Sequence, residues 1–82
     1  MEAYNRYRNH ILTILNRRPF FIEDLAIEVE EEIESSPFQH FNMVFFGEVI
    51  EWMVNIGDLD RVRRWVILRN GNYSKSWLVS TN

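Results

Sequence analysis

The spacing of apolar residues changes once along this 82-residue chain, near Gly57, and this change is the strongest constraint on the fold. Before Gly57, apolar residues recur every three or four positions, which is the period of an amphipathic helix. After it, residues 62–69 and 73–79 are rich in Val, Ile, Leu, Trp and Tyr, as strands are. The dipeptide Asn70-Gly71 between them suits a tight turn. The chain is therefore expected to be mainly α, with a small C-terminal β-hairpin.

Two helices and a short strand are predicted in the first half. Residues 3–16 carry apolar side chains on one face, and Pro19 ends this helix because proline disfavours a helical conformation in the residue before it. Residues 20–22 are apolar and fit a small strand. Residues 23–34 form the second amphipathic helix, with glutamates on most of its other positions.

The third helix is predicted to end at about Ile56, with Gly57 as its C-terminal stop. Two starts are compatible with the sequence. Ser36 can be an N-cap, with Pro37 in the first helical position and a Ser-x-x-Gln capping box. The helix can also begin as late as Asn42, which makes residues 37–40 an insertion in the turn.

The register of the hairpin is open at this stage. A three-residue loop would place Trp65 opposite Trp77. We therefore expect the indoles of Trp65 and Trp77 to be cross-strand neighbours.

Composition indicates one globular domain over residues 1–82. The chain is 46% apolar and 15% aromatic with a net charge of only −3, which argues against disorder. It has no cysteine, which excludes a disulfide framework, a thiolate zinc site and a thiol nucleophile. Residues 1–6 lack the apolar core of a signal peptide, and no apolar run is long enough to cross a membrane. We expect an intracellular protein, in the cytoplasm or, for a virus-encoded chain, in the host cytoplasm.

Catalysis has little support in the sequence. The two histidines, His10 and His40, are far apart along the chain, and the carboxylates are spread over a helix face. We therefore expect no enzymatic activity, no cofactor, no metal site and no small-molecule substrate.

The order of helix, short strand, helix, helix and hairpin resembles the winged helix-turn-helix superfamily. The segment VIEWMVNIGDLDRVRRW, residues 49–65, is similar to the end of a recognition helix, a glycine-led turn and the first wing strand. The segment FIEDLAIEV is similar to the short strand and second helix. The resemblance implies three helices plus a two-stranded wing, with the wing at about residues 69–74. Most domains of this kind bind DNA, and a minority bind proteins.

Charge is distributed unevenly along the chain. Residues 1–21 hold four Arg and one Glu, residues 22–51 hold nine acids and no Lys or Arg, and residues 52–82 hold four Arg, one Lys and two Asp. Because DNA affinity comes largely from neutralised phosphates, the acidic central segment disfavours a major-groove contact. Glu48 and Glu51, on the third helix, would face phosphates there.

The wing offers a second mode of nucleic-acid binding. Its candidate residues are the basic ones on the two predicted strands: Arg61, Arg63, Arg64, Arg69 and Lys75. Trp65, Tyr73 and Trp77 are interleaved with them, and such aromatic residues can stack on unpaired bases. The alternative is structural, with these arginines, and Arg17 and Arg18, paired with the acidic helices.

The third helix carries more apolar surface than one core contact requires, an arc of about 220°. One stripe, centred near Phe45 and Val49, is the expected core; it also contains Phe38, Phe41, Trp52, Met53 and Ile56. The second stripe is predicted to be an exposed protein interface, with Gly47 beside it for close approach. The interface candidates are Met43, Phe46, Gly47, Ile50 and Val54.

These observations favour a small non-enzymatic regulatory module that acts through a protein surface. Its partner would be a second copy or another protein that it adapts or inhibits. The alternative is a winged-helix DNA-binding transcriptional regulator that uses the basic wing.

Overall fold

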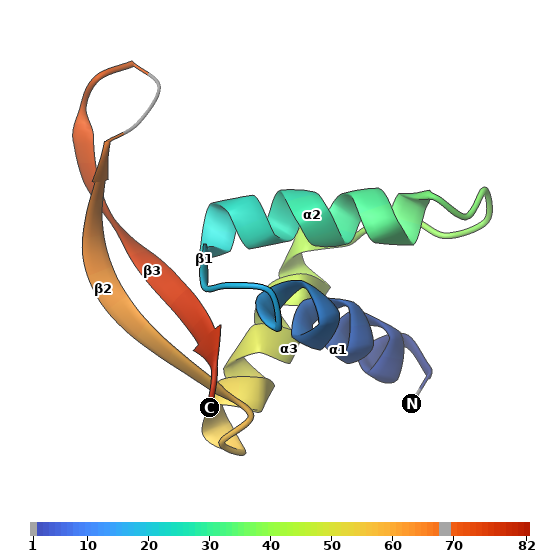
Figure 1. Cartoon of the computed structure of the whole chain (residues 1–82). Helices are drawn as coiled ribbons and strands as arrows, with labels where there is room; N and C mark the ends of the chain where they lie inside the picture. The colour runs from blue at the N-terminus through green and yellow to red at the C-terminus, as the bar shows by residue number, and fades with distance from the viewer. Residues whose placement is uncertain (1, 68–69) are drawn as a thin grey trace.

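The computed structural model, which describes residues 2–67 and 70–82, contains three helices and three strands (Figure 1). In chain order they are α1 (Glu2–Leu15), β1 (Phe20–Phe21), α2 (Ile22–Glu34), α3 (Met43–Asn55), β2 (Leu59–Ile67) and β3 (Tyr73–Thr81). The expected α+β class is confirmed. The short predicted strand is present as β1, and α2 begins directly after it.

The three strands form one antiparallel sheet in the order β1-β3-β2. Phe20 lies opposite Val79, so β1 is hydrogen-bonded to the base of the hairpin. Figure 1 shows the other end of the hairpin rising away from the helices. The hairpin is thus held at its base by the core and by β1.

The predicted pairing of Trp65 with Trp77 is wrong by two positions. Trp65 lies opposite Lys75, and Trp77 lies opposite Arg63. Among the described residues, the pairing closest to the turn is Ile67 with Tyr73. Gly71 has a φ of 86°, which a side chain would strain. Leu68 and Arg69, the last two residues of the predicted strand 62–69, lie outside the described residues.

The core is built from one face of each helix and the base of the sheet. α1, α2 and α3 each contribute one buried stripe at helical spacing, and the sheet adds three side chains. The buried apolar residues are Tyr7, Ile11, Ile14, Leu15, Phe20, Leu25, Ala26, Val29, Ile33, Phe46, Val49, Ile50, Met53, Leu59 and Val79.

The later of the two predicted starts of α3 is correct, and the capping box at Ser36 is wrong. Asn42 is the N-cap, and its side-chain Oδ1 accepts a hydrogen bond of 2.9 Å from the Phe45 N–H. The Asn42 N–H donates to the Tyr7 hydroxyl at 2.9 Å, which ties this start to α1. Phe38, in the turn before α3, is 91% exposed. The prediction that Phe38 belongs to the core is therefore wrong.

Candidate functional site

The predicted interface strip on α3 is not an exposed surface. Phe46 and Ile50 are each only 1% exposed and belong to the core, so these two predictions are wrong. Val54 and Gly47 are half-buried. Of the five candidates, Met43 alone is well exposed, at 60%.

The error has a packing cause. α3 contacts α1 on one side and β2 on another, so the middle of its apolar arc is buried and both margins emerge. Val49 and Met53 lie in the buried middle, beside Phe46 and Ile50. Two residues that the sequence pattern assigned to the core are exposed: Trp52, at the margin of the arc, by 47%, and Ile56, the C-cap just after α3, by 55%.

The solvent face of α3 is acidic. A shallow hollow on this face is lined by Val44, Gly47, Glu48, Glu51, Trp52 and Asn55. Trp52 packs against Tyr4 of α1, with ring centroids 4.4 Å apart. The two glutamates give this face the wrong charge for a helix that would approach phosphates.

The hairpin carries the strongest concentration of cationic and aromatic side chains. Because side chains alternate between the faces of a strand, the register places six of them on one face, with Tyr73 nearest the turn. We call the other five the cation–aromatic face: Arg61, Arg63, Trp65, Lys75 and Trp77. The period-two spacing of these residues in the sequence is the signal from which this face is predictable.

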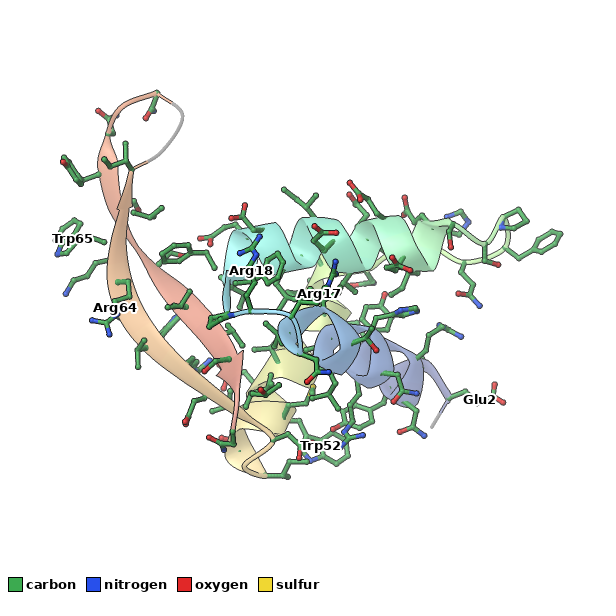
Figure 2. The ribbon with its side chains drawn as sticks, viewed as in Figure 1. Glu2, Arg17, Arg18, Trp52, Arg64 and Trp65 are labelled. Atoms are coloured by element: carbon green, nitrogen blue, oxygen red, sulfur yellow. The ribbon has the colours of Figure 1, made fainter. Side chains whose placement is uncertain are left out.

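Each indole of this face has a cation beside it. The guanidinium carbons of Arg61 and Arg63 lie 4.8 Å and 4.7 Å from the centroid of the Trp77 ring. The Lys75 ammonium lies 5.6 Å from the centroid of the Trp65 ring. These distances are within the range of cation–π attraction, so the rings hold the cations in place beside them. Trp65 is still 64% exposed, and Figure 2 shows it on the side of the hairpin away from the helices.

Among residues 2–67 and 70–82, the structural alternative for the arginines holds at Arg61, which pairs with Glu51 of α3. A further ion pair joins Arg8 of α1 to Asp58, in the turn before β2, at 3.0 Å. Arg18 stacks on Phe20, its guanidinium carbon 3.8 Å from the ring centroid.

The five basic candidates of the wing are therefore not one group. The cation–aromatic face brings Arg61, Arg63 and Lys75 together. Arg64 is exposed on the opposite face of β2, and Arg69 lies outside the described residues. Sequence reasoning did not anticipate Glu51 as the partner of Arg61, because 10 residues and a change of element separate them.

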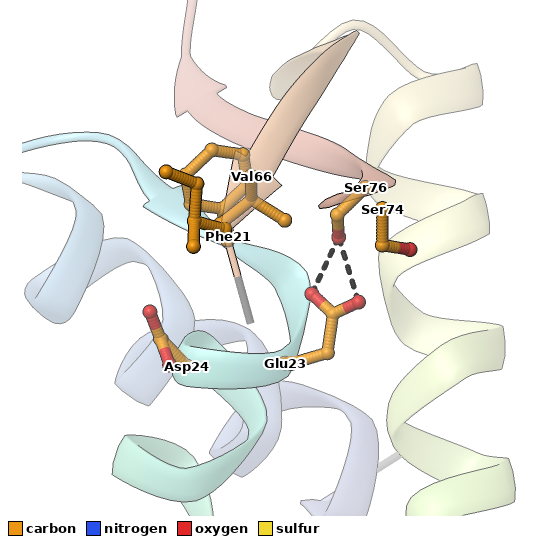
Figure 3. A pocket seen from close by; sticks show the side chains of 7 residues that line it. Phe21, Glu23, Asp24, Val66, Ser74 and Ser76 are labelled. Carbon is orange, nitrogen blue, oxygen red and sulfur yellow. Dashed lines mark hydrogen bonds between the residues drawn. The ribbon is translucent and has the colours of Figure 1, made fainter. Parts of the chain in front are cut away.

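The opposite face of the hairpin is turned toward the start of α2. The Ser76 hydroxyl, in a side chain only 5% exposed, donates to the Glu23 carboxylate, 2.7 Å from Oε1 and 2.5 Å from Oε2 (Figure 3). A cavity of about 190 Å³ lies beside this contact, lined also by Phe21, Asp24 and Val66. This contact ties the hairpin to α2 and turns the cation–aromatic face away from that helix.

His10 is half-buried on α1 and His40 is exposed in the turn before α3. Within the part of the chain that the structure describes, no group of three or more His, Asp or Glu side chains is placed to hold a metal ion.

Among the helices that the structure describes, none has the length and apolar character that crossing a membrane requires.

Comparison of the chain with protein-family models, with curated proteins and with solved structures finds no match.

Proposed function

We propose that this chain is a winged-helix-type, non-enzymatic regulatory domain that binds nucleic acid through its hairpin. The order of elements and the strand order β1-β3-β2 support the winged-helix part of the proposal, since a C-terminal hairpin beside three helices is what that resemblance implies. In this proposal α3, the third helix in chain order, takes the recognition position.

The cation–aromatic face is the observation that carries the proposal. Arginine and lysine on an exposed hairpin can contact phosphates, and exposed aromatic rings add stacking surface. Arg63, Lys75 and Trp65 are all exposed. The acidic face of α3 points to contact led by the hairpin, because Glu48 and Glu51 repel phosphates.

A nucleic-acid titration at several salt concentrations tests this function. Binding should weaken steeply between about 50 and 200 mM salt, because cations on the protein displace condensed counterions. The double variant Arg63→Ala/Lys75→Ala, which removes two cations of the cation–aromatic face, should weaken binding and reduce the salt slope by up to about two. Arg17→Ala, at the end of α1 and away from the hairpin in Figure 2, is the matched control and should change the slope little. Absence of binding to both duplex and single-stranded probes at low salt would overturn the proposal.

A second candidate function is regulation through self-association. Between α2 and α3 lies a largely apolar groove of about 280 Å³, lined by Ile22, Glu23, Ala26, Met43, Phe46 and Gly47. Charge complementarity favours a second copy as its occupant. α2 is strongly acidic, while the hairpin combines basic residues with the exposed apolar side chains of Trp65, Ile67 and Tyr73.

The solution mass from light scattering tests this second candidate. A dimer that Met43→Glu dissociates, and that Phe38→Glu in the turn outside the groove leaves intact, supports it. A monomeric mass across the accessible concentration range would rule out self-association as the function.

A further inference from the structure

Three features of the hairpin and its neighbour α3 favour a single strand over a duplex on the cation–aromatic face. We infer that the ligand is single-stranded nucleic acid, with at least one unpaired base stacked on Trp65. This inference rests on the proposed function and narrows its ligand class.

Trp65 is the ring that is available for stacking. Its side chain is 64% exposed, and Tyr73, on the same face and two pairs closer to the turn, is 69% exposed. Lys75 lies directly opposite Trp65. Bases in a duplex are already stacked and paired, so only an unpaired base can lie flat on this indole.

Cations and indoles are neighbours on this face. Along β2, Arg61 and Arg63 precede Trp65, and along β3, Lys75 precedes Trp77, with successive side chains of one face about 7 Å apart. Across the hairpin, Trp65 faces Lys75 and Trp77 faces Arg63. A single strand exposes bases and phosphates in alternation, so it can place bases on the rings while its phosphates meet the adjacent cations. A duplex exposes phosphates on its outside and leaves the rings without a partner.

The position of α3 adds a penalty for a duplex. The Arg61–Glu51 pair joins the cation–aromatic face to the acidic solvent face of α3, where Glu48 also lies. A rigid duplex wide enough to cover both surfaces brings phosphates toward these carboxylates. A flexible single strand can follow the hairpin alone and avoid them.

The experiment compares four fluorescent probes at low salt with the whole chain. They are oligothymidylate of about 12 nucleotides, oligouridylate of the same length, an abasic strand that keeps the phosphates, and the corresponding duplex. Both base-containing single strands should bind at least about tenfold more tightly than the abasic strand and the duplex. The difference in affinity between oligothymidylate and oligouridylate shows whether the hairpin prefers DNA or RNA.

Two variants locate the stacking residue. Trp65→Ala should weaken binding to the single strands about tenfold, while Trp65→Phe keeps a ring and most of the affinity. Circular dichroism checks that both variants fold. In a Trp52→Phe background, tryptophan fluorescence should be quenched by oligothymidylate and not by the abasic strand.

The failures of the two proposals are distinguishable. If the duplex binds as tightly as the single strands, or the abasic strand as tightly as oligothymidylate, the single-strand inference is overturned and binding through the hairpin stands. If none of the four probes binds, the proposed function fails, and this inference fails with it.

Discussion

Arg61 of β2 and Glu51 of α3 form a two-pronged ion pair, in which Nη1 donates to Oε1 and Nη2 lies 3.3 Å from Oε2. The pair joins the hairpin to the solvent face of α3. Because the Glu51 carboxylate neutralises Arg61, the cation–aromatic face has less positive charge available to bind a polyanion.

The variant Glu51→Gln should therefore increase nucleic-acid affinity at low salt and steepen the salt slope by up to about one, because it frees Arg61 for a phosphate. The pair is partly exposed, so the free energy of unfolding should fall by less than about 1 kcal/mol. Titration and urea unfolding measure the two effects. Glu30→Gln on the exposed face of α2 changes net charge equally, and an equal gain for both variants would show that the ion pair is irrelevant.

Shortening a side chain of α3 should cost more stability in the buried part of its apolar arc than at the exposed margin. Ile50→Ala should lower the free energy of unfolding by about 2–5 kcal/mol, because it leaves a cavity in the core. Met43→Ala, on an exposed side chain, should cost less than about 1 kcal/mol. Ile50→Glu should unfold the chain. A folded and soluble Ile50→Glu protein, seen by circular dichroism, would contradict the burial of this residue.

The N-cap of α3 gives a third prediction. Asn42→Ala should reduce the free energy of unfolding by about 1 kcal/mol, because the Phe45 N–H loses its side-chain acceptor. Asn42→Ser should retain most of that stability, since serine also caps well. Ser36→Ala is the control, and its expected change is within about 0.5 kcal/mol. Denaturant unfolding that shows the larger loss at Ser36 would favour the earlier helix start.

The contact between Ser76 and Glu23 should be measurable as a coupling. Ser76→Ala should cost about 1–2 kcal/mol, because a buried hydroxyl that donates to a carboxylate is lost. Glu23→Gln should cost less when Ser76 is already alanine than in the wild type, with a coupling of about 0.5 kcal/mol or more. Ser74→Ala, at a half-buried residue lining the same cavity, is the matched control. Strict additivity in a double-mutant cycle would show that the contact does not couple the hairpin to α2.

Much of the secondary structure was predictable because its causes are local. The apolar spacing of α1 and α2 is a property of each segment alone, and Pro19 marks a boundary by its own geometry. The hairpin was predictable from two β-rich segments around Asn70-Gly71. The period-two spacing of Arg61, Arg63 and Trp65 is also a local signal, but the sequence-based prediction grouped Arg64 with them and did not separate the two faces.

The predictions about α3 depended on its neighbours. Its wide apolar arc is compatible with several rotations about the helix axis, and only contact with α1 on one side and β2 on another selects the arc around Phe46 and Ile50 for burial. Its start at Met43 likewise depends on the hydrogen bond between the Asn42 N–H and the Tyr7 hydroxyl, which lies 35 residues away in the chain.

The sequence by itself determined the elements, the −9 and +3 charge blocks in residues 22–51 and 52–82, and the mixture of cations and indoles on the hairpin strands. The tertiary structure decided the register that pairs Trp65 with Lys75 and the rotation that buries Ile50. It also decided the contact that commits Arg61 to Glu51. The physical reason is that periodicity and turn chemistry act within a few residues, whereas register, burial and ion pairing are selected by surfaces from distant parts of the chain.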